Sequence, residues 1–298
     1  MNIITWTPYI GGCRNKEVWF PTLKHLFDLQ NEDSGRAFTV VEAWAADMPS
    51  NGRAAVLNEH LLSQFPGGIS GQQAARALQV LLKSNMLKGE DVIGIGHSAG
   101  ACVMIQSTTD YPLDKLPYSS LILVEPVVLN PEVKERITEA GSPLRKIIEF
   151  ASTRQDIWPN RAAAREWFAE QLPWNQWDAR VLDLYIEHAL RELPTAAYPD
   201  EREGVTPSTT RAAEIAAYQH YEDALEAFQI LRDLCAAIPV HSVVGSIQDR
   251  IPAEVHALAE PKVKSVRRVE GVGHHVVQRD PRGLAEAIWS ILGEEYVP

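Results

Sequence analysis

Residues 94–100 read Gly-Ile-Gly-His-Ser-Ala-Gly, and the last five of these residues form a G-x-S-x-G motif. The motif follows an apolar stretch that begins at Val92, and a helix-forming stretch, 101–105, comes after it. A serine on a sharp strand-to-helix turn adopts a strained backbone, and flanking glycines let the neighbouring chain approach closely. Such a turn holds the hydroxyl at a helix N-terminus, where the helix dipole stabilises developing negative charge. Ser98 is therefore a candidate nucleophile.

Strand-like and helix-like segments alternate on both sides of this motif. The predicted strands include residues 3–7, 38–44, 120–124, 240–244 and 263–269, the last of them edge-like. The predicted helices of the same regions include residues 19–29, 70–82, 252–259 and 284–292. Repeated β-α-β order predicts an α/β fold with a mostly parallel sheet and helices on both of its faces.

Residues 127–235 have a different pattern, because strand signals vanish and helical periodicity dominates at 143–151, 161–171, 178–193 and 211–234. We expect this segment to be a helical cap inserted into a core made of residues 1–126 and 236–298. Four of the eight tryptophans lie in the segment. Most of them are expected to pack between helices, whereas Trp158 and Trp177 are candidates for lining a substrate pocket, together with His97 beside the serine.

Composition restricts the class of partner. The 298 residues carry a formal net charge of −11, which argues against binding to nucleic acid. Contact with an anionic substrate would need a local basic patch. No apolar run is long enough to span a bilayer and no secretory signal leads the sequence, so we expect a cytoplasmic protein without membrane contact. The three cysteines show no metal or disulfide spacing, and we expect neither a metal nor a cofactor.

A serine hydroxyl needs a base to take its proton. Among nine histidines, the pair in Gly271-Val-Gly-His-His275 follows the last predicted strand in a glycine-rich loop. We predict that His274 is the general base. His275 is expected to point the other way, since adjacent side chains in an extended loop diverge.

The base in turn needs a carboxylate that fixes its tautomer and stabilises the imidazolium. Two candidates follow predicted strands in the order serine, acid, histidine. Glu125 ends the strand at 120–124, and Asp249 lies in the loop after the strand at 240–244. Spacing alone leaves both assignments open.

The oxyanion hole is expected to use the backbone N–H of Ala99 and a second N–H from the loop after the first strand. Gly11 and Gly12 would let this loop approach the substrate. Gly12 and Cys13 are the two candidates for the second donor.

The residues resemble the α/β-hydrolase superfamily over almost the whole chain, and more narrowly a group of fungal hydrolases. That group contains peroxisomal lipases, toxin-biosynthesis esterases and the acyl-CoA hydrolase of mycophenolic acid formation. Besides the serine motif, the segments that carry the resemblance are Lys16–Pro21, Ala46–Gly52, Leu57–Glu59, Leu123–Pro126, Arg154–Trp158 and Trp177–Tyr185. The resemblance implies an α/β-hydrolase fold and places the triad acid after the strand that follows the serine turn, at Glu125.

Two features depart from that group. The usual His-Gly dipeptide of the oxyanion loop is absent around Gly11 and Gly12, and the C-terminal residues 295–298 are not a peroxisomal tripeptide.

The sequence thus predicts a serine hydrolase that cleaves an ester or thioester of a small-molecule acyl substrate. Two alternatives stay open. The same site could run a lyase, cyclase or acyltransferase step on a polyketide-like substrate, or the fold could be a catalytically silent ligand-binding module. An exposed sheet edge would favour a homodimer.

Overall fold

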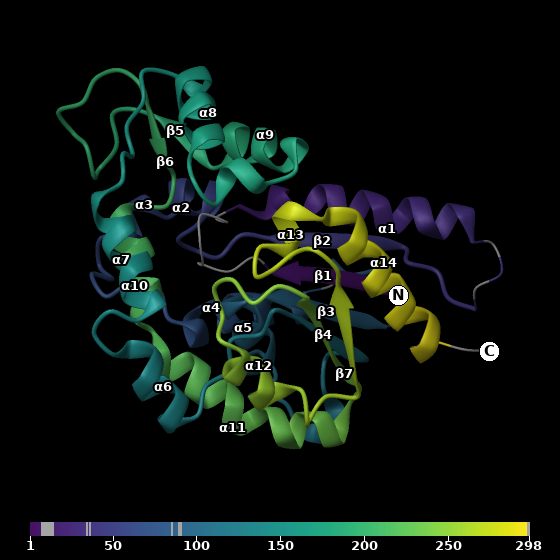
Figure 1. Ribbon diagram of the computed structural model, residues 1–298. Coiled ribbons are helices and arrows are strands. Elements are labelled where there is room, and N and C mark those ends of the chain that lie inside the picture. The colour runs from purple at the N-terminus through teal and green to yellow at the C-terminus, as the bar shows by residue number, and fades with distance from the viewer. Residues whose placement is uncertain (7–14, 34, 36, 85, 89–90, 297–298) are drawn as a thin grey trace.

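The computed structural model describes residues 1–6, 15–33, 35, 37–84, 86–88 and 91–296 (Figure 1). Its centre is a six-stranded sheet with the strand order β2-β1-β3-β4-β7-β8. The strands are β1 (Asn2–Trp6), β2 (Glu42–Ala46), β3 (Val92–His97), β4 (Ser120–Val124), β7 (Val240–Gly245) and β8 (Ser265–Val269). Every neighbouring pair runs parallel, which confirms the predicted sheet.

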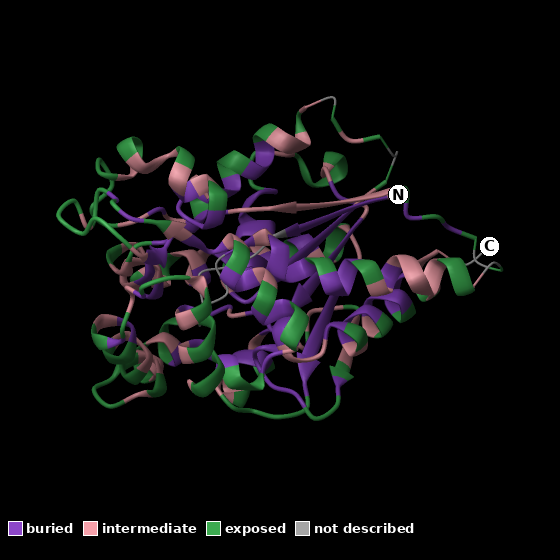
Figure 2. Cartoon of the chain, turned by 90° about the horizontal axis from the view of Figure 1, so that it is seen from above, coloured by how far each residue is buried: buried purple, intermediate pink, exposed green. Residues whose placement is uncertain are grey.

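Helices cover both faces of the sheet. Successive side chains of a strand point to opposite faces, so neighbouring residues pack against different helices. Ile3 packs with α1 (Phe20–Glu32) and α14 (Pro281–Glu295) in one apolar cluster. Its neighbour Ile4 packs on the other face with α4 (Gly71–Leu82), α5 (Ala99–Gln106) and α11 (Tyr221–Ala237). Figure 2 shows the buried central strands between these helices, whose outer sides are exposed.

Short helices complete the layers around the sheet. They are η2 (Lys16–Trp19), α2 (Gly52–Leu57), α3 (Glu59–Leu62), η3 (Leu113–Lys115), α12 (Ala253–Ala259) and α13 (Val276–Arg279). No helix in the described parts of the chain is long and apolar enough to cross a bilayer.

One predicted helix is confirmed, whereas one predicted strand begins later than expected. The helix predicted at 70–82 is α4, and Ser70 caps it through a reciprocal bond with Gln73. The strand predicted at 38–44 begins only at Glu42. Val40 is buried, but the side-chain amide of Gln30 bonds both its N–H and its carbonyl, so this backbone is satisfied outside the sheet.

The segment between β4 and β7, here called the insertion (127–235), is mainly helical. Its further elements are α6 (Pro131–Thr138), α7 (Pro143–Thr153), α8 (Arg161–Glu170), η4 (Trp174–Gln176), α9 (Ala179–His188), β5 (Leu190–Glu192), β6 (Val205–Pro207) and α10 (Arg211–Gln219). The expectation that strands are absent was wrong, because β5 and β6 form a short antiparallel pair. The helix predicted at 211–234 is divided at His220 into α10 and α11, and α11 lies against α5.

An aromatic cluster fills the part of the insertion around α8, η4 and α9. Trp158 packs on Trp167 and Phe168, with ring centroids 5.4 and 4.9 Å away. Its backbone also pairs with Val205 at the start of β6. Edge-to-face and tilted contacts of this kind add to the stabilisation that burial of the rings provides.

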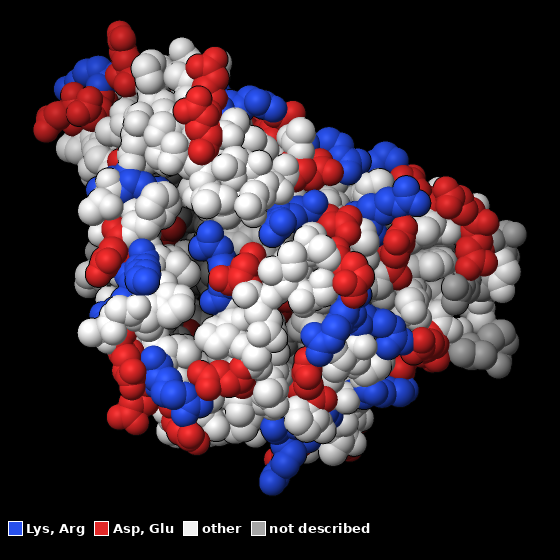
Figure 3. All heavy atoms as spheres, in the orientation of Figure 1, with Lys and Arg blue, Asp and Glu red and all other residues white. Residues whose placement is uncertain are grey.

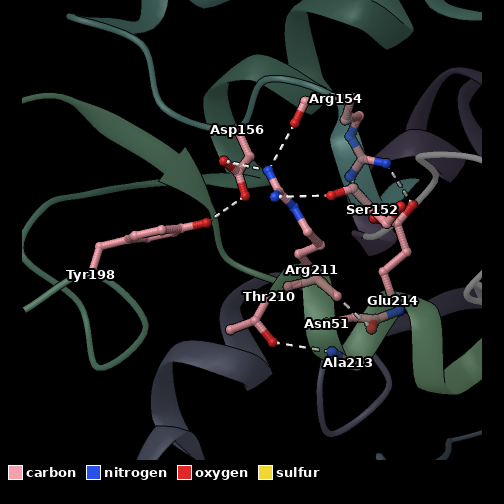
Figure 4. Close-up of polar contacts among 10 residues, drawn as sticks. Asn51, Ser152, Arg154, Asp156, Tyr198, Thr210, Arg211, Ala213 and Glu214 are labelled. Atoms are coloured by element: carbon pink, nitrogen blue, oxygen red, sulfur yellow. Dashed lines mark hydrogen bonds and ion pairs between the residues drawn. The ribbon is translucent and has the colours of Figure 1, made fainter. Parts of the chain in front are cut away.

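A partly buried ionic group, here called the Arg154 cluster, consists of Arg154, Asp156, Tyr198, Arg211 and Glu214 (Figure 4). The Arg154 guanidinium donates to both carboxylate oxygens of Glu214, and both side chains are buried. Arg211 lies 2.9 Å from Asp156 and donates to the carbonyls of Ser152 and Arg154. The cluster therefore fixes the C-terminal end of α7 to the first turns of α10.

Candidate active site

The sharp strand-to-helix turn predicted at Ser98 is present between β3 and α5. Ser98 has φ 55° and ψ −124°, a backbone conformation that non-glycine residues rarely adopt. The Ser98 N–H donates to the Val124 carbonyl of the neighbouring strand at 2.8 Å. A Cβ on Gly96 would lie 2.4 Å from the Gly100 carbonyl oxygen, so the turn leaves no room for a side chain at that position.

The structure brings three predicted residues together in a row. Ser98 Oγ lies 2.9 Å from His274 Nε2, and His274 Nδ1 lies 3.1 Å from Glu125 Oε2. All three side chains are buried. They come from three places at one end of the sheet, namely the turns after β3 and β4 and the loop between β8 and α13.

Glu125 is held on both carboxylate oxygens. Gly245 donates its backbone N–H to Oε1 at 2.6 Å, and His256 Nε2 lies 3.2 Å from Oε2. Burial by itself raises the pKa of Glu125, but the contacts with His256 and His274 outweigh burial and hold that pKa well below its usual range. Glu125 is therefore ionised and can stabilise a protonated imidazole. No sequence pattern points to His256, which lies in the middle of α12.

Asp249, the other candidate acid, contacts the backbone of the base rather than its ring. Its carboxylate accepts the His274 N–H at 2.9 Å and lies 3.7 Å from Arg279. A Cβ on Gly273 would lie 2.4 Å from this carboxylate, so glycine is required for the approach. The geometry thus gives the two acids different contacts, and only Glu125 reaches the imidazole.

His97 and His275 are buried neighbours of the base. His97 Nε2 donates to the His274 carbonyl at 2.8 Å, which requires a proton on that nitrogen. Burial, reinforced by the nearby His274, lowers the pKa of His97 to about 3. Burial also lowers the pKa of His275 well below its usual value, with the charge of Arg250 as the next contribution. Both rings are therefore neutral near pH 7, and the bond from His97 helps to fix the backbone of His274.

Of the predicted oxyanion donors, Ala99 is among the residues that the structure describes. Ala99 is the first residue of α5 and directly follows Ser98, so its N–H belongs to the unpaired first turn of the helix. Gly12 and Cys13 lie outside the described residues.

A cavity of about 90 Å³ reaches Ala99 and extends between α5 and the insertion. Its apolar walls include Met48, Ile69, Val103, Val127, Leu129 and Ile137. Tyr218 of α10 lines this cavity and also a second one of about 300 Å³. Sequence patterns did not point to Tyr218, because its side chain reaches both cavities only through the packing of α10.

The two predicted pocket tryptophans line neither of these cavities. Trp158 lies in the aromatic cluster described above, and the ring of Trp177 lies 6.2 Å from that of His275. Trp174, which was not singled out, lines the larger cavity instead.

Known proteins resemble this chain over all or part of its length. The "Type I acyl-CoA thioesterase mpaH" of Penicillium brevicompactum is 27% identical over 303 residues, covering 99% of this chain and 64% of that protein. The chain thus spans less than two thirds of this curated relative. The "Abhydrolase domain-containing protein AKT2" of Alternaria alternata is 28% identical over 101 residues, 34% of each chain.

Among solved structures, the peroxisomal alpha-beta-hydrolase Lpx1 of Saccharomyces cerevisiae superimposes with a TM-score of 0.76 at 15% identity. The match covers 99% of this chain and 77% of that chain, and it shows a shared fold. The sequence model of the "Alpha/beta hydrolase family" matches residues 11–287. Since that match spans most of the chain, and the sheet, the serine turn and the insertion agree with it, the chain belongs to the alpha/beta hydrolase family.

Proposed function

We propose that the protein is a serine hydrolase that cleaves an ester or thioester through an acyl-enzyme on Ser98. The observation that carries the proposal is the unbroken row of contacts from Ser98 Oγ through the His274 ring to the Glu125 carboxylate. A hydroxyl, an imidazole and an ionised acid in this order form the arrangement that activates a serine for attack on an acyl carbon.

In the first half of the reaction, Ser98 Oγ attacks the acyl carbon while its proton passes to His274 Nε2. Glu125 stabilises the imidazolium through Nδ1 and does not take the proton itself. The oxyanion lies at the N-terminus of α5, against the N–H of Ala99, with Gly12 or Cys13 as the proposed second donor. The leaving alcohol or thiol then takes the proton from Nε2 as its bond to the acyl carbon breaks.

In the second half, a water molecule gives its proton to Nε2 and attacks the ester carbon. Ser98 Oγ leaves with the proton returned by His274, and the free acid is released. Atoms and charges balance over the cycle, and the enzyme returns to its starting state.

The substrate class rests on the cavity beside Ala99 and on the relatives. The mainly apolar walls fit a medium-sized apolar acyl group. The thioesterase name of the Penicillium relative supports a thioester as well as an ester. In this proposal the insertion serves as the cap that encloses the acyl group.

A fluorophosphonate probe and two acyl donors test the proposal together. We expect the protein to be labelled and to hydrolyse p-nitrophenyl hexanoate and the hexanoyl thioester of N-acetylcysteamine. Ser98→Ala should lose both labelling and turnover while its circular dichroism and thermal midpoint stay close to those of the unmodified protein. Ser63→Ala, at an exposed serine far from the site in sequence, is the matched control.

Each contrary outcome has a separate meaning. Absence of labelling would support a silent ligand-binding fold. Labelling without release of hexanoate into water, but with transfer to an added alcohol or amine, would support an acyltransferase.

A further inference from the structure

The larger cavity, of about 300 Å³, lies between α7, the turn at 172–174, α10 and the loop after β7. Figure 3 shows a hollow on this face of the molecule, between the insertion and the core, with basic side chains beside it. Tyr218 separates the cavity from the smaller one that reaches Ala99. The two cavities therefore share Tyr218 as a wall, and they are neighbours in the insertion.

The lining of this cavity is positively charged, in contrast to the protein as a whole. Lys146, Arg154 and Arg250 line it, and among the described residues that do so Glu214 is the one acid. Glu214 is already engaged by Arg154 in the bidentate pair of the Arg154 cluster (Figure 4). Lys146 and Arg250 thus contribute two charges that this pair does not neutralise, within a chain whose formal net charge is −11.

Arg250 is also adjacent in sequence to a residue that contacts His274. Arg250 directly follows Asp249, whose carboxylate binds the backbone N–H of His274. Its charge contributes, after burial, to the lowered pKa of His275, the residue next to the base. Arg250 therefore connects the lining of this cavity with the loop whose Asp249 holds the His274 backbone.

The remaining walls are apolar and aromatic, with Ile147, Phe150, Leu172 and Trp174 as their main members. A ligand that satisfies both kinds of wall has an apolar body and an anionic end. Guanidinium and ammonium groups bind carboxylate and phosphate oxygens by charge-assisted hydrogen bonds.

We propose that Lys146 and Arg250 form a subsite for the anionic end of the substrate, a carboxylate or a phosphate joined to the acyl bond by a spacer. The inference rests on the proposed hydrolase function and adds the charge of the substrate to it. The two residues act on binding and specificity, whereas Ser98 and His274 act on the bond.

Matched substrates separate the two sources of negative charge. For a carboxylate, the pair is p-nitrophenyl hexanoate and mono-p-nitrophenyl adipate, which have the same chain length. For a phosphate, the pair is the hexanoyl thioester of N-acetylcysteamine and hexanoyl-CoA. We expect kcat/KM to favour the anionic member of one pair, mainly through KM, and the preference to shrink as salt is raised.

The double variant Lys146→Gln/Arg250→Gln should lower kcat/KM for the preferred anionic substrate by about tenfold. Turnover of its neutral partner should stay unchanged. Arg145→Gln is the matched control, because Arg145 precedes Lys146 on α7 but does not line the cavity. An equal loss on the charged and the neutral substrate, or no preference in the unmodified protein, would show that the subsite inference is wrong while hydrolysis stands.

Calorimetric titration of the Ser98→Ala variant measures ligand affinity directly, so it tests the subsite without any hydrolysis. Adipamate, hexanamide and free CoA are the ligands, and we expect adipamate or CoA to bind more tightly than hexanamide. The double variant on the Ser98→Ala background should lose this difference. If neither ester nor thioester is hydrolysed, the hydrolase proposal fails, and this titration still tests the anion subsite by itself.

Discussion

Two ionic groups of this molecule use their charges in opposite ways. They are the Ser98–His274–Glu125 row and the Arg154 cluster, whose central pair, Arg154 and Glu214, is buried. In the first, an imidazole lies between a hydroxyl and a carboxylate, so a proton can move along the row. In the second, a guanidinium faces a carboxylate through two hydrogen bonds. Burial lowers the pKa of Arg154, yet arginine keeps its proton in proteins, so this pair stays charged. Burial of charge alone therefore does not indicate a catalytic site, whereas a titratable group held between two partners is a reason to propose one.

The largest expected effect separates the two acids near the base. Glu125→Gln should lower kcat by about 10³- to 10⁴-fold, because the imidazole loses the charge that stabilises its protonated form. Asp249→Asn should have a much smaller effect, since an amide oxygen can still accept the His274 N–H. Steady-state kinetics on p-nitrophenyl hexanoate measure both. A crippled Asp249→Asn beside an active Glu125→Gln would reverse the assignment.

The second prediction concerns stability rather than turnover. Arg154→Met leaves Glu214 charged and buried, and should lower the free energy of unfolding by about 3–5 kcal/mol. The double variant Arg154→Met/Glu214→Leu should recover much of this loss. Urea denaturation measures the change, and Glu286→Gln, in an exposed helix pair with Arg282, serves as the control with an effect of at most about 0.5 kcal/mol.

The turnover of each active site in the Arg154→Met variant tests whether the Arg154 cluster takes part in the chemistry. After correction for the labelled fraction, kcat of the folded Arg154 variant should equal that of the unmodified protein. A fall of the corrected kcat by orders of magnitude would give the Arg154 cluster a direct part in the chemistry.

The third prediction is a loss of stability in acid. Since the pKa of His97 is lowered to about 3 when folded, the unfolded chain binds a proton below its usual pKa of 6.5 while the folded chain does not. Stability is therefore fully present above about pH 6.5 and falls as the pH drops toward 3, with His275 acting in the same direction.

His97 should remove about 2 kcal/mol between about pH 7 and pH 5, and His275 should add a loss in the same direction. Glu125 adds to the loss below its ordinary pKa of 4.5, because its folded pKa is depressed. Urea midpoints at several pH values measure the slope, and His97→Gln should make it shallower. An unchanged slope in that variant would show that other groups dominate acid unfolding.

The smallest expected effect tests His256 as a positioning residue for Glu125. His256→Gln should lower kcat by up to about tenfold and leave KM unchanged, because Glu125 loses one of the contacts that fix its carboxylate. Fluorophosphonate titration of the active fraction separates this change from partial unfolding. A rise of KM with constant kcat would instead indicate a role in substrate binding.

Short sequence patterns were sufficient to predict the serine turn and the parallel sheet, because both depend on residues that are close together in the chain. The serine turn could be predicted from its sequence. The glycines of G-x-S-x-G allow two backbone segments to approach closely, and the motif lies between a strand-like and a helix-like stretch. The parallel sheet followed from the β-α-β order of apolar segments. Spacing left Glu125 and Asp249 open, since both follow strands; family resemblance favoured Glu125, whose side chain faces the His274 ring.

The parts that could not be predicted depend on contacts between distant residues. Arg154 and Glu214 are 60 positions apart, and each looks like an ordinary helix charge in the sequence. The pair of β5 and β6 has only three residues in each strand, too few for a recognisable alternation. His256 reaches Glu125 only because α12 packs beside the end of β4, which no motif signals.

The backbone of Ser98 and Glu125 has a consequence for how far this protein can be stabilised. Both residues have positive φ, 55° and 50°, and their N–H groups continue the ladder to the next strand at 2.8 Å each. A non-glycine residue in such a conformation carries about 1–3 kcal/mol of strain, which glycine would relieve. Within the described parts of the chain, the non-glycine residues with positive φ are thus those proposed as the nucleophile and the acid. Selection for heat resistance alone would favour the loss of activity at these positions, so stability and catalysis are in direct conflict there.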